Sequence, residues 1–191
     1  MYVEQNSWFH KRRIARWWDK ALQLNPLGYL VVTVPAELVS YILSCDKIHA
    51  QEILKNLRTY WKRKLFRDLK ISKGLMNYHW AGDDGFTFKP HLNICMDNNR
   101  WVASSELNSW QQDYLKWIEK IYPVKVCANT MFLNYQCKSK KKNILHVLKY
   151  ITRSTMRVYN KQYAEIIKGF RNFITIGNFN KQGVNTSSNS S

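Results

Sequence analysis

The segment KPHLN at residues 89–93 places two side chains with metal-binding chemistry two positions apart. Side chains alternate along a β-strand, so His91 and Asn93 would share one face while Leu92 enters the core behind it. An imidazole nitrogen and an amide oxygen can bind the same divalent ion, and a mixed set that leaves positions open for a phosphate suits Mn²⁺ or Mg²⁺. The alternative for His91 is a histidine held by hydrogen bonds for structural reasons alone.

The residues before this segment offer candidates for a third ligand. If two paired strands are joined by a loop centred near Gly85, His79 lies across the hairpin from His91. Asp83 and Asp84 compete for the same position, although aspartates beside a glycine are also typical of a turn. We therefore predict His79 as the third ligand, with Asp84 as its rival.

A tyrosine in the basic stretch NILHVLKYITRSTMR, residues 143–157, is a candidate nucleophile. Tyr150 follows Lys149, and Arg153 comes one helical turn later, with Arg157 one turn beyond that. Cations near a phenol lower the cost of forming its anion and can also bind a phosphate. The alternative is a tyrosine that only packs against the core.

Periodicity and turn signals predict the elements that must position these residues. Helices are expected at 1–24, 36–70 (with a break near 45–47), 105–122, 143–157 and 159–169. Strands are expected at 29–34, 75–80, 86–96, 124–128, 131–137 and 173–177, with 75–80 and 86–96 forming a hairpin. This order predicts an α+β fold, a central antiparallel β-sheet with flanking helices. We expect a single domain over residues 1–180 and a disordered polar tail at 181–191.

The charge of the chain predicts its partner. Lys and Arg number 30 against 13 Asp and Glu, a formal net charge of +17. Self-repulsion on this scale destabilises a compact chain, so a polyanion, with nucleic acid first, is the expected partner. The N-terminal segment carries both basic and aromatic side chains, which can clamp single-stranded DNA. Trp17 and Trp18 in that segment are equally candidates for the core.

Other features of the sequence narrow the function classes. The first residues lack the apolar region of a secretory signal, and the apolar run near residues 27–39 is too short and interrupted to span a bilayer. The four cysteines never form a CxxC pair, so we expect free thiols in a cytoplasmic protein and no structural zinc site. A GxxxxGK[ST] motif is missing, so any strand separation would need a separate helicase.

Taken together, these segments resemble the HUH endonuclease superfamily, the His-hydrophobic-His nickases that include rolling-circle replication initiators and related transposases. LGYLVVTVP at 27–35 resembles the first family motif, and YHWAGDDGFTFKPHLNIC at 78–95 resembles the metal motif. HVLKYITRSTMR at 146–157 resembles the tyrosine motif, and GFRNFITIGNF at 169–179 is similar to the region that follows it. The motifs occur in the family's order.

The sequence departs from the family pattern at two positions. Asn93 stands where the second histidine of the metal motif is usual; some replication initiators have glutamine there, so an amide ligand is compatible with the pattern. Ser154 stands where the two-tyrosine transposases have their second tyrosine. The resemblance therefore favours a single-tyrosine initiator. It selects Tyr150 over Tyr159 and Tyr163, which lie beyond the aligned segment.

The resemblance implies a ferredoxin- or RRM-like core and a metal-dependent enzyme that nicks and rejoins single-stranded DNA through a covalent 5′-phosphotyrosine. The implied ligands are His91, Asn93 and His79, and the implied phosphate contacts are Lys149, Arg153 and Arg157. Expected partners are single-stranded DNA or an origin hairpin, with a host polymerase and helicase. Neither a membrane nor a small-molecule substrate is expected. The alternatives are a rolling-circle transposase with the same chemistry and a non-catalytic nucleic-acid-binding protein.

Overall fold

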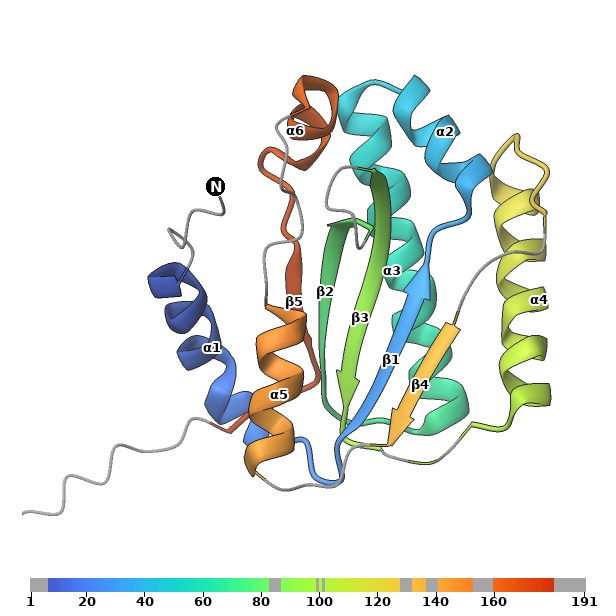
Figure 1. Ribbon diagram of the computed structural model, residues 1–191. Helices are drawn as coiled ribbons and strands as arrows, with labels where there is room; N and C mark the ends of the chain where they lie inside the picture. The colour runs from blue at the N-terminus through green and yellow to red at the C-terminus, as the bar shows by residue number, and fades with distance from the viewer. Residues whose placement is uncertain are drawn as a thin grey trace, which may run out of the picture.

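The computed structural model describes residues 7–82, 87–98, 100, 102–127, 132–136, 141–152 and 160–180. The predicted tail at 181–191 lies outside these residues. The elements follow in the order α1 (Ser7–Leu22), β1 (Gly28–Thr33), α2 (Ala36–Ser44), α3 (Lys47–Leu69), β2 (Gly74–Ala81), β3 (Phe88–Met96), α4 (Ser104–Ile121), β4 (Phe132–Gln136), α5 (Lys141–Ile151), α6 (Lys161–Ile167) and β5 (Phe173–Ile176) (Figure 1).

The strands form one five-stranded sheet in the order β4-β1-β3-β2-β5. Every neighbouring pair is antiparallel. From β1 to β4 the chain follows a β-α-β-β-α-β path with β3 inserted between β1 and β2, which is the ferredoxin-like arrangement. β5 pairs with the outer edge of β2 and extends the sheet. The predicted α+β fold, an antiparallel sheet with flanking helices, is confirmed.

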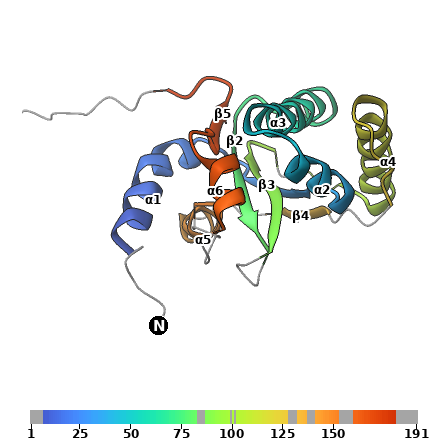
Figure 2. The same ribbon diagram turned by 90° about the horizontal axis from the view of Figure 1, so that it is seen from above.

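The sheet separates two hydrophobic cores. The larger core lies on the side of α2, α3 and α4, and the smaller lies on the side of α1 and α5, as the view from above shows (Figure 2). Alternation along β3 divides its side chains between the two: Leu92 and Ile94 enter the larger core, whereas Cys95 belongs to the smaller one. The smaller core is therefore the face on which His91 and Asn93 lie.

The longest helix, α3, begins and ends as its sequence predicts. The Asp46 side chain caps the helix by accepting a 2.9 Å hydrogen bond from the His49 backbone N–H, which accounts for the break between α2 and α3. Lys70 ends the helix in a left-handed conformation, with φ of 52°. The apolar positions predicted at helical spacing are all buried: Ile53, Leu54, Leu57, Trp61, Leu65 and Leu69.

The strand predicted at 124–128 is wrong for residues 124–127, which join no sheet. Side-chain carboxylates take the backbone donors that a strand would offer to a neighbour. The Val126 N–H donates to Glu119 Oε1 at 2.9 Å, and the Cys127 N–H donates to Glu37 Oε1 at 3.2 Å. Apolar alternation predicted a strand here. A local pattern contains no information about hydrogen bonds to carboxylates of the distant helices α2 and α4.

Two further expectations concern the chain as a whole. Among the helices that the structure describes, none combines the length and apolar character needed to cross a membrane. Among the described residues no disulfide involves Cys45, Cys95 or Cys127, and Cys137 lies outside the described residues.

Candidate active site on the α5 face of the sheet

The β2–β3 hairpin brings the two predicted histidines together. His79 and His91 are direct partners in the antiparallel register, and their ring centroids lie 5.2 Å apart in an edge-to-face arrangement. His79 is buried and His91 is half-buried. The prediction that His79 faces His91 across the hairpin is confirmed by this register.

Hydrogen bonds to backbone carbonyls assign the protonated nitrogen of each ring. His79 Nε2 lies 3.0 Å from the Ile151 carbonyl oxygen, and His91 Nδ1 lies 2.9 Å from the Lys89 carbonyl oxygen. A carbonyl only accepts, so each of these nitrogens carries the proton and donates it. The second nitrogen of each neutral ring then keeps its lone pair. Histidine ligands of metal ions are commonly held in this way, by a carbonyl that accepts from the other ring nitrogen.

Asn93 lies on the same face as His91, and it is fully buried. Its amide oxygen accepts a hydrogen bond from the Tyr29 hydroxyl of β1. The amide nitrogen Nδ2 is buried and finds no hydrogen-bond partner within the described part of the chain. An amide oxygen has two lone pairs, so Asn93 can accept from Tyr29 and still offer one electron pair to an ion.

Helix α5 places Tyr150 over this pair of histidines. Its ring centroid lies 5.7 Å from that of His79 and 6.1 Å from that of Tyr29. Tyr150 is partly exposed, while Ile144 and Leu148 on the same helix are buried in the smaller core. The apolar side of α5 therefore fixes the helix against the sheet and leaves the tyrosine at the border between core and solvent.

The end of α5 is tied to β2 through one carbonyl oxygen. The Ile151 oxygen accepts from His79 Nε2 and also from Asn77 Nδ2. Asn77 and His79 are two residues apart on β2, so both side chains point to the α5 face. This double contact holds the histidine ring and the tyrosine helix in one arrangement.

Sequence reasoning missed Tyr29 and Asn77. Both are polar residues on strands that the sequence predicted. Once the strand order is known, alternation along each strand places them on the same face of the sheet as the histidines. That order arises from contacts far apart in the chain, so no local pattern singled these two residues out. Tyr29 contacts the predicted ligand Asn93, and Asn77 contacts the helix that carries Tyr150.

Two other tyrosines near the hairpin are engaged in packing. Tyr163, one rival nucleophile, stacks on Phe88 with ring centroids 4.8 Å apart. Tyr78 faces the larger core, where its hydroxyl donates to the Leu54 carbonyl at 2.8 Å. Burial raises the pKa of Tyr78 well above its ordinary value, so this phenol stays protonated.

The remaining predicted residues are placed only in part. Lys149 is exposed beside Tyr150 on α5. The other candidates lie outside the described residues: Asp83, Asp84, Arg153, Arg157 and Tyr159.

The donor set fits a divalent ion. With metal–nitrogen bonds of about 2.1 Å, two imidazoles on one ion have ring centres on the order of 5 Å apart, and the observed 5.2 Å agrees. Within the described ranges no group of three or more His, Cys, Asp or Glu side chains could hold a metal, so the set depends on the Asn93 amide as its third member. All three donors are neutral, which leaves the charge of an ion to be balanced by an anionic ligand such as a phosphate.

Four secondary-structure elements thus bring imidazole, amide and phenol groups to one point of the sheet. β1 contributes Tyr29, the β2–β3 hairpin contributes His79, His91 and Asn93, and α5 contributes Tyr150. The chain matches no protein-family model, no curated protein and no solved structure.

Proposed function

We propose that this protein is a metal-dependent DNA endonuclease and strand transferase that initiates rolling-circle replication. The observation that carries the proposal is the grouping of His79, His91 and Tyr150 on one face of the sheet, with ring centroids within 6 Å of His79. In the sequence Tyr150 lies 59 positions after His91 and 71 positions after His79. The fold brings the three residues together from β2, β3 and α5. A paired histidine site beside a partly exposed phenol is suited to phosphoryl transfer.

In the proposed reaction the Tyr150 oxygen attacks the phosphorus of a DNA phosphodiester. A bond from phosphorus to the tyrosine oxygen forms while the bond from phosphorus to the 3′ oxygen breaks. The phenol loses its proton and the departing 3′ oxygen gains one. The products are a 5′-phosphotyrosine and a free 3′-hydroxyl, and attack by another 3′-hydroxyl reverses the step and rejoins the strand.

Several side chains would prepare the site for this step. His79, His91 and Asn93 would hold Mn²⁺ or Mg²⁺, and the bound ion would supply positive charge beside the scissile phosphate. Tyr29 would hold the Asn93 amide in place through its hydroxyl. The Ile151 carbonyl would keep the His79 ring in one tautomer and one orientation.

The proposed substrate is single-stranded DNA or an origin hairpin. The net charge of +17 supports a polyanionic substrate. Lys149, Arg153 and Arg157 are proposed phosphate contacts around the nick. A host polymerase would extend the free 3′-hydroxyl and a host helicase would separate the strands, which places the proposed activity in the cytoplasm.

One observation favours a second candidate, a non-catalytic nucleic-acid-binding protein. The Asn93 oxygen already accepts a hydrogen bond from Tyr29, and the residue is fully buried. If this contact is purely structural, only two imidazoles remain to hold an ion. Such a protein would bind DNA through the same basic surface without cutting it.

The test is capture of the covalent intermediate. The full chain is incubated with a pool of circular single-stranded DNA and Mn²⁺, and the denatured mixture is examined for protein joined to DNA. We expect an adduct, with the modified peptide containing Tyr150. Tyr150→Phe removes only the hydroxyl, so adduct and cleavage should vanish while DNA binding persists.

Tyr163→Phe is the matched control, because this tyrosine stacks on Phe88 and has no proposed role. It should form the adduct at the rate of the unaltered protein. An adduct mapped to Tyr159 or Tyr163 would assign the nucleophile elsewhere. Metal-independent DNA binding without any adduct would favour the non-catalytic candidate.

A further inference from the structure

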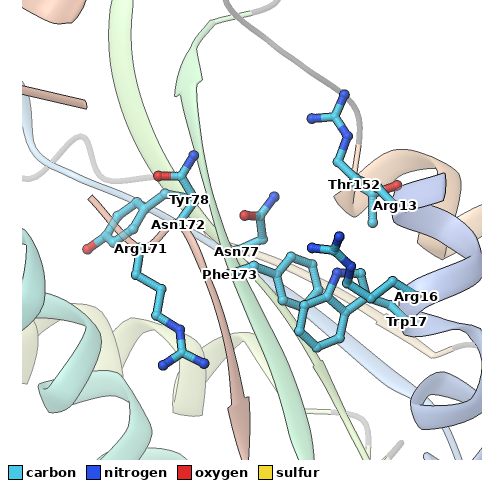
Figure 3. Close-up of a pocket in the computed structure, with 9 residues that line it drawn as sticks. All are labelled: Arg13, Arg16, Trp17, Asn77, Tyr78, Thr152, Arg171, Asn172 and Phe173. Atoms are coloured by element: carbon cyan, nitrogen blue, oxygen red, sulfur yellow. The ribbon is translucent and has the colours of Figure 1, made fainter. Parts of the chain in front are cut away.

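A cavity of about 460 Å³ lies between α1 and the sheet, next to the end of α5. Its walls are basic, amide and aromatic, and no acidic residue is among them: Arg13, Arg16, Trp17, Asn77, Tyr78, Thr152, Arg171, Asn172 and Phe173. Figure 3 shows the Arg13 and Arg16 side chains on the α1 side of the cavity, with the Arg171 side chain extending away from both. Arg13 and Arg16 are therefore the two cations of the cavity that lie side by side on α1, with Arg171 at another part of its wall.

These two arginines lack a counter-charge. They are three residues apart on α1 and so lie on the same side of the helix. Neither takes part in an ion pair within the described part of the chain. Arg13 is half-buried, and its Nε is fully buried with no hydrogen-bond partner among the described residues. A buried donor on a charged group without an acceptor is costly, and an anion in the cavity would remove that cost.

The aromatic wall indicates which part of a ligand the cavity would recognise. Trp17 stacks on Phe173 with ring centroids 3.9 Å apart, and Lys20 Nζ lies 4.9 Å from the Trp17 ring centroid. Because these contacts already occupy the faces of the Trp17 indole, it lines the cavity and is not available for stacking with a nucleic-acid base. The groups offered to a ligand are guanidinium N–H donors, which match the oxygens of a phosphate.

The cavity borders the candidate active site. Asn77, which lines the cavity, shares the Ile151 carbonyl with His79. The two residues lie two positions apart on β2, a separation of about 6.7 Å along the strand. Neighbouring phosphates of one nucleic-acid strand are separated by a similar distance. The wall of the cavity at Asn77 therefore lies about one phosphate spacing from His79, and a strand bound at the histidines can continue into the cavity.

We propose that Arg13 and Arg16 form a subsite for a backbone phosphate of single-stranded DNA, in the cavity next to the phosphate bound at His79 and His91. The identity of the ligand as DNA rests on the function proposed above. The subsite itself rests on the cavity, its two arginines and the buried Arg13 Nε.

The test measures binding of a short fluorescein-labelled oligothymidylate by fluorescence anisotropy, without metal ions, between low and physiological ionic strength. Each lost phosphate contact reduces the slope of log affinity against log salt by about 0.7 for a single strand. Arg13→Gln with Arg16→Gln removes the contacts to this one phosphate, so it should lower the slope by about 0.7 and weaken binding at low salt by about tenfold. Lys55→Gln with Lys62→Gln is the matched control, because it removes two exposed charges from α3, on the other side of the sheet. This control should keep the slope of the unaltered protein.

An unchanged slope in the arginine double variant, or an equal change in the α3 control, would overturn the subsite. Because Arg13 is half-buried, Arg16→Gln alone provides a variant at an exposed position that leaves packing intact. It should lower the slope by up to about 0.7, and an unchanged slope in this folded variant would likewise overturn the subsite.

A second arm distinguishes DNA from free phosphate, which has the same chemistry. Inorganic phosphate is titrated into the protein by calorimetry. Saturable phosphate binding that Arg16→Gln abolishes, with oligothymidylate binding unchanged, would overturn the assignment to DNA. The binding assay does not require cleavage, so it is independent of the adduct test. A reduced slope without any adduct would support the subsite and reject the nickase. An adduct with an unchanged slope would support the nickase and reject the subsite.

Discussion

The Tyr29 hydroxyl donates a hydrogen bond to the Asn93 amide oxygen between two neighbouring strands of the sheet. Both residues are buried, and the Tyr29 ring also contacts the edge of Tyr150 at a centroid distance of 6.1 Å. One residue of β1 thus contacts a proposed metal ligand and the proposed nucleophile at once. This makes Tyr29 a positioning residue for both.

Tyr29→Phe should therefore affect stability and the site together. It leaves the Asn93 oxygen buried without this donor, which we expect to cost about 1–3 kcal/mol in the free energy of unfolding. Urea unfolding measures this cost, and Mn²⁺ titration calorimetry measures metal affinity, which should fall because the amide is no longer held. Repeating the change in an Asn93→Leu background should cost less, since the acceptor is gone. Equal costs in both backgrounds would mean that the hydrogen bond contributes nothing.

His91→Ala should abolish Mn²⁺-dependent cleavage, because it removes one of two imidazoles in the proposed site. The half-buried position of His91 leaves the fold intact, and single-stranded DNA affinity should change little, since the proposed lysine and arginine contacts to phosphates lie elsewhere. Cleavage of labelled DNA and anisotropy measure the two effects separately. His49→Ala, at an exposed position of α3, is the control and should cut normally. Full activity of His91→Ala would remove this residue from the site.

Asn93→His tests the amide as a substituted ligand. Imidazole binds transition metals more strongly than an amide oxygen does, so Mn²⁺ affinity should be kept or raised. Calorimetry measures the affinity, and circular dichroism verifies that the larger side chain is accommodated next to Tyr29. A folded variant that no longer binds Mn²⁺ would show that Asn93 acts through its hydrogen bond and not as a ligand.

Acid should destabilise the protein partly through Asp68 on α3. Burial on its own would raise the pKa of Asp68, but hydrogen bonds from Arg67 and Lys64 outweigh it, and the pKa lies below its ordinary value. A carboxyl group with a lowered pKa contributes its stability in full above the unfolded value of about 4 and loses it as the pH falls through the folded value.

Asp68→Asn should therefore lower the urea midpoint at pH 6 and show a smaller further loss at pH 3 than the unaltered protein does. Asp19→Asn, at an exposed position of α1, is the control and should keep the pH dependence of the unaltered protein. If Asp68→Asn and the unaltered protein lose equal stability between the two pH values, the ion pairs of Asp68 with Lys64 and Arg67 do not stabilise the fold.

Local patterns were sufficient for the hairpin and for the site residues on it. Alternation placed His91 and Asn93 on one face with Leu92 on the other, and the turn signal in the sequence predicted the register that sets His79 opposite His91. Helical spacing likewise placed Ile144 and Leu148 in the core and left Tyr150 at its border. These are relations between residues close in sequence or joined by one turn.

Relations across the sheet could not be predicted in the same way. Tyr29 meets Asn93 only because β3 is inserted between β1 and β2, and the order of strands depends on packing over the whole chain. The strand predicted at 124–128 was wrong for residues 124–127 for a related reason: Glu37 and Glu119, from two other elements, accept hydrogen bonds from backbone N–H groups of this segment.

The division of the interior into two cores has a consequence for motion. The layer of α1 and α5 rests on the smaller core, while the other face of the sheet stays packed against α3. Such a layer can separate from the sheet at a free energy below that of global unfolding. Backbone amides of α5 should therefore exchange with solvent deuterium faster than those of α3, through an opening of this layer that leaves most of the molecule folded.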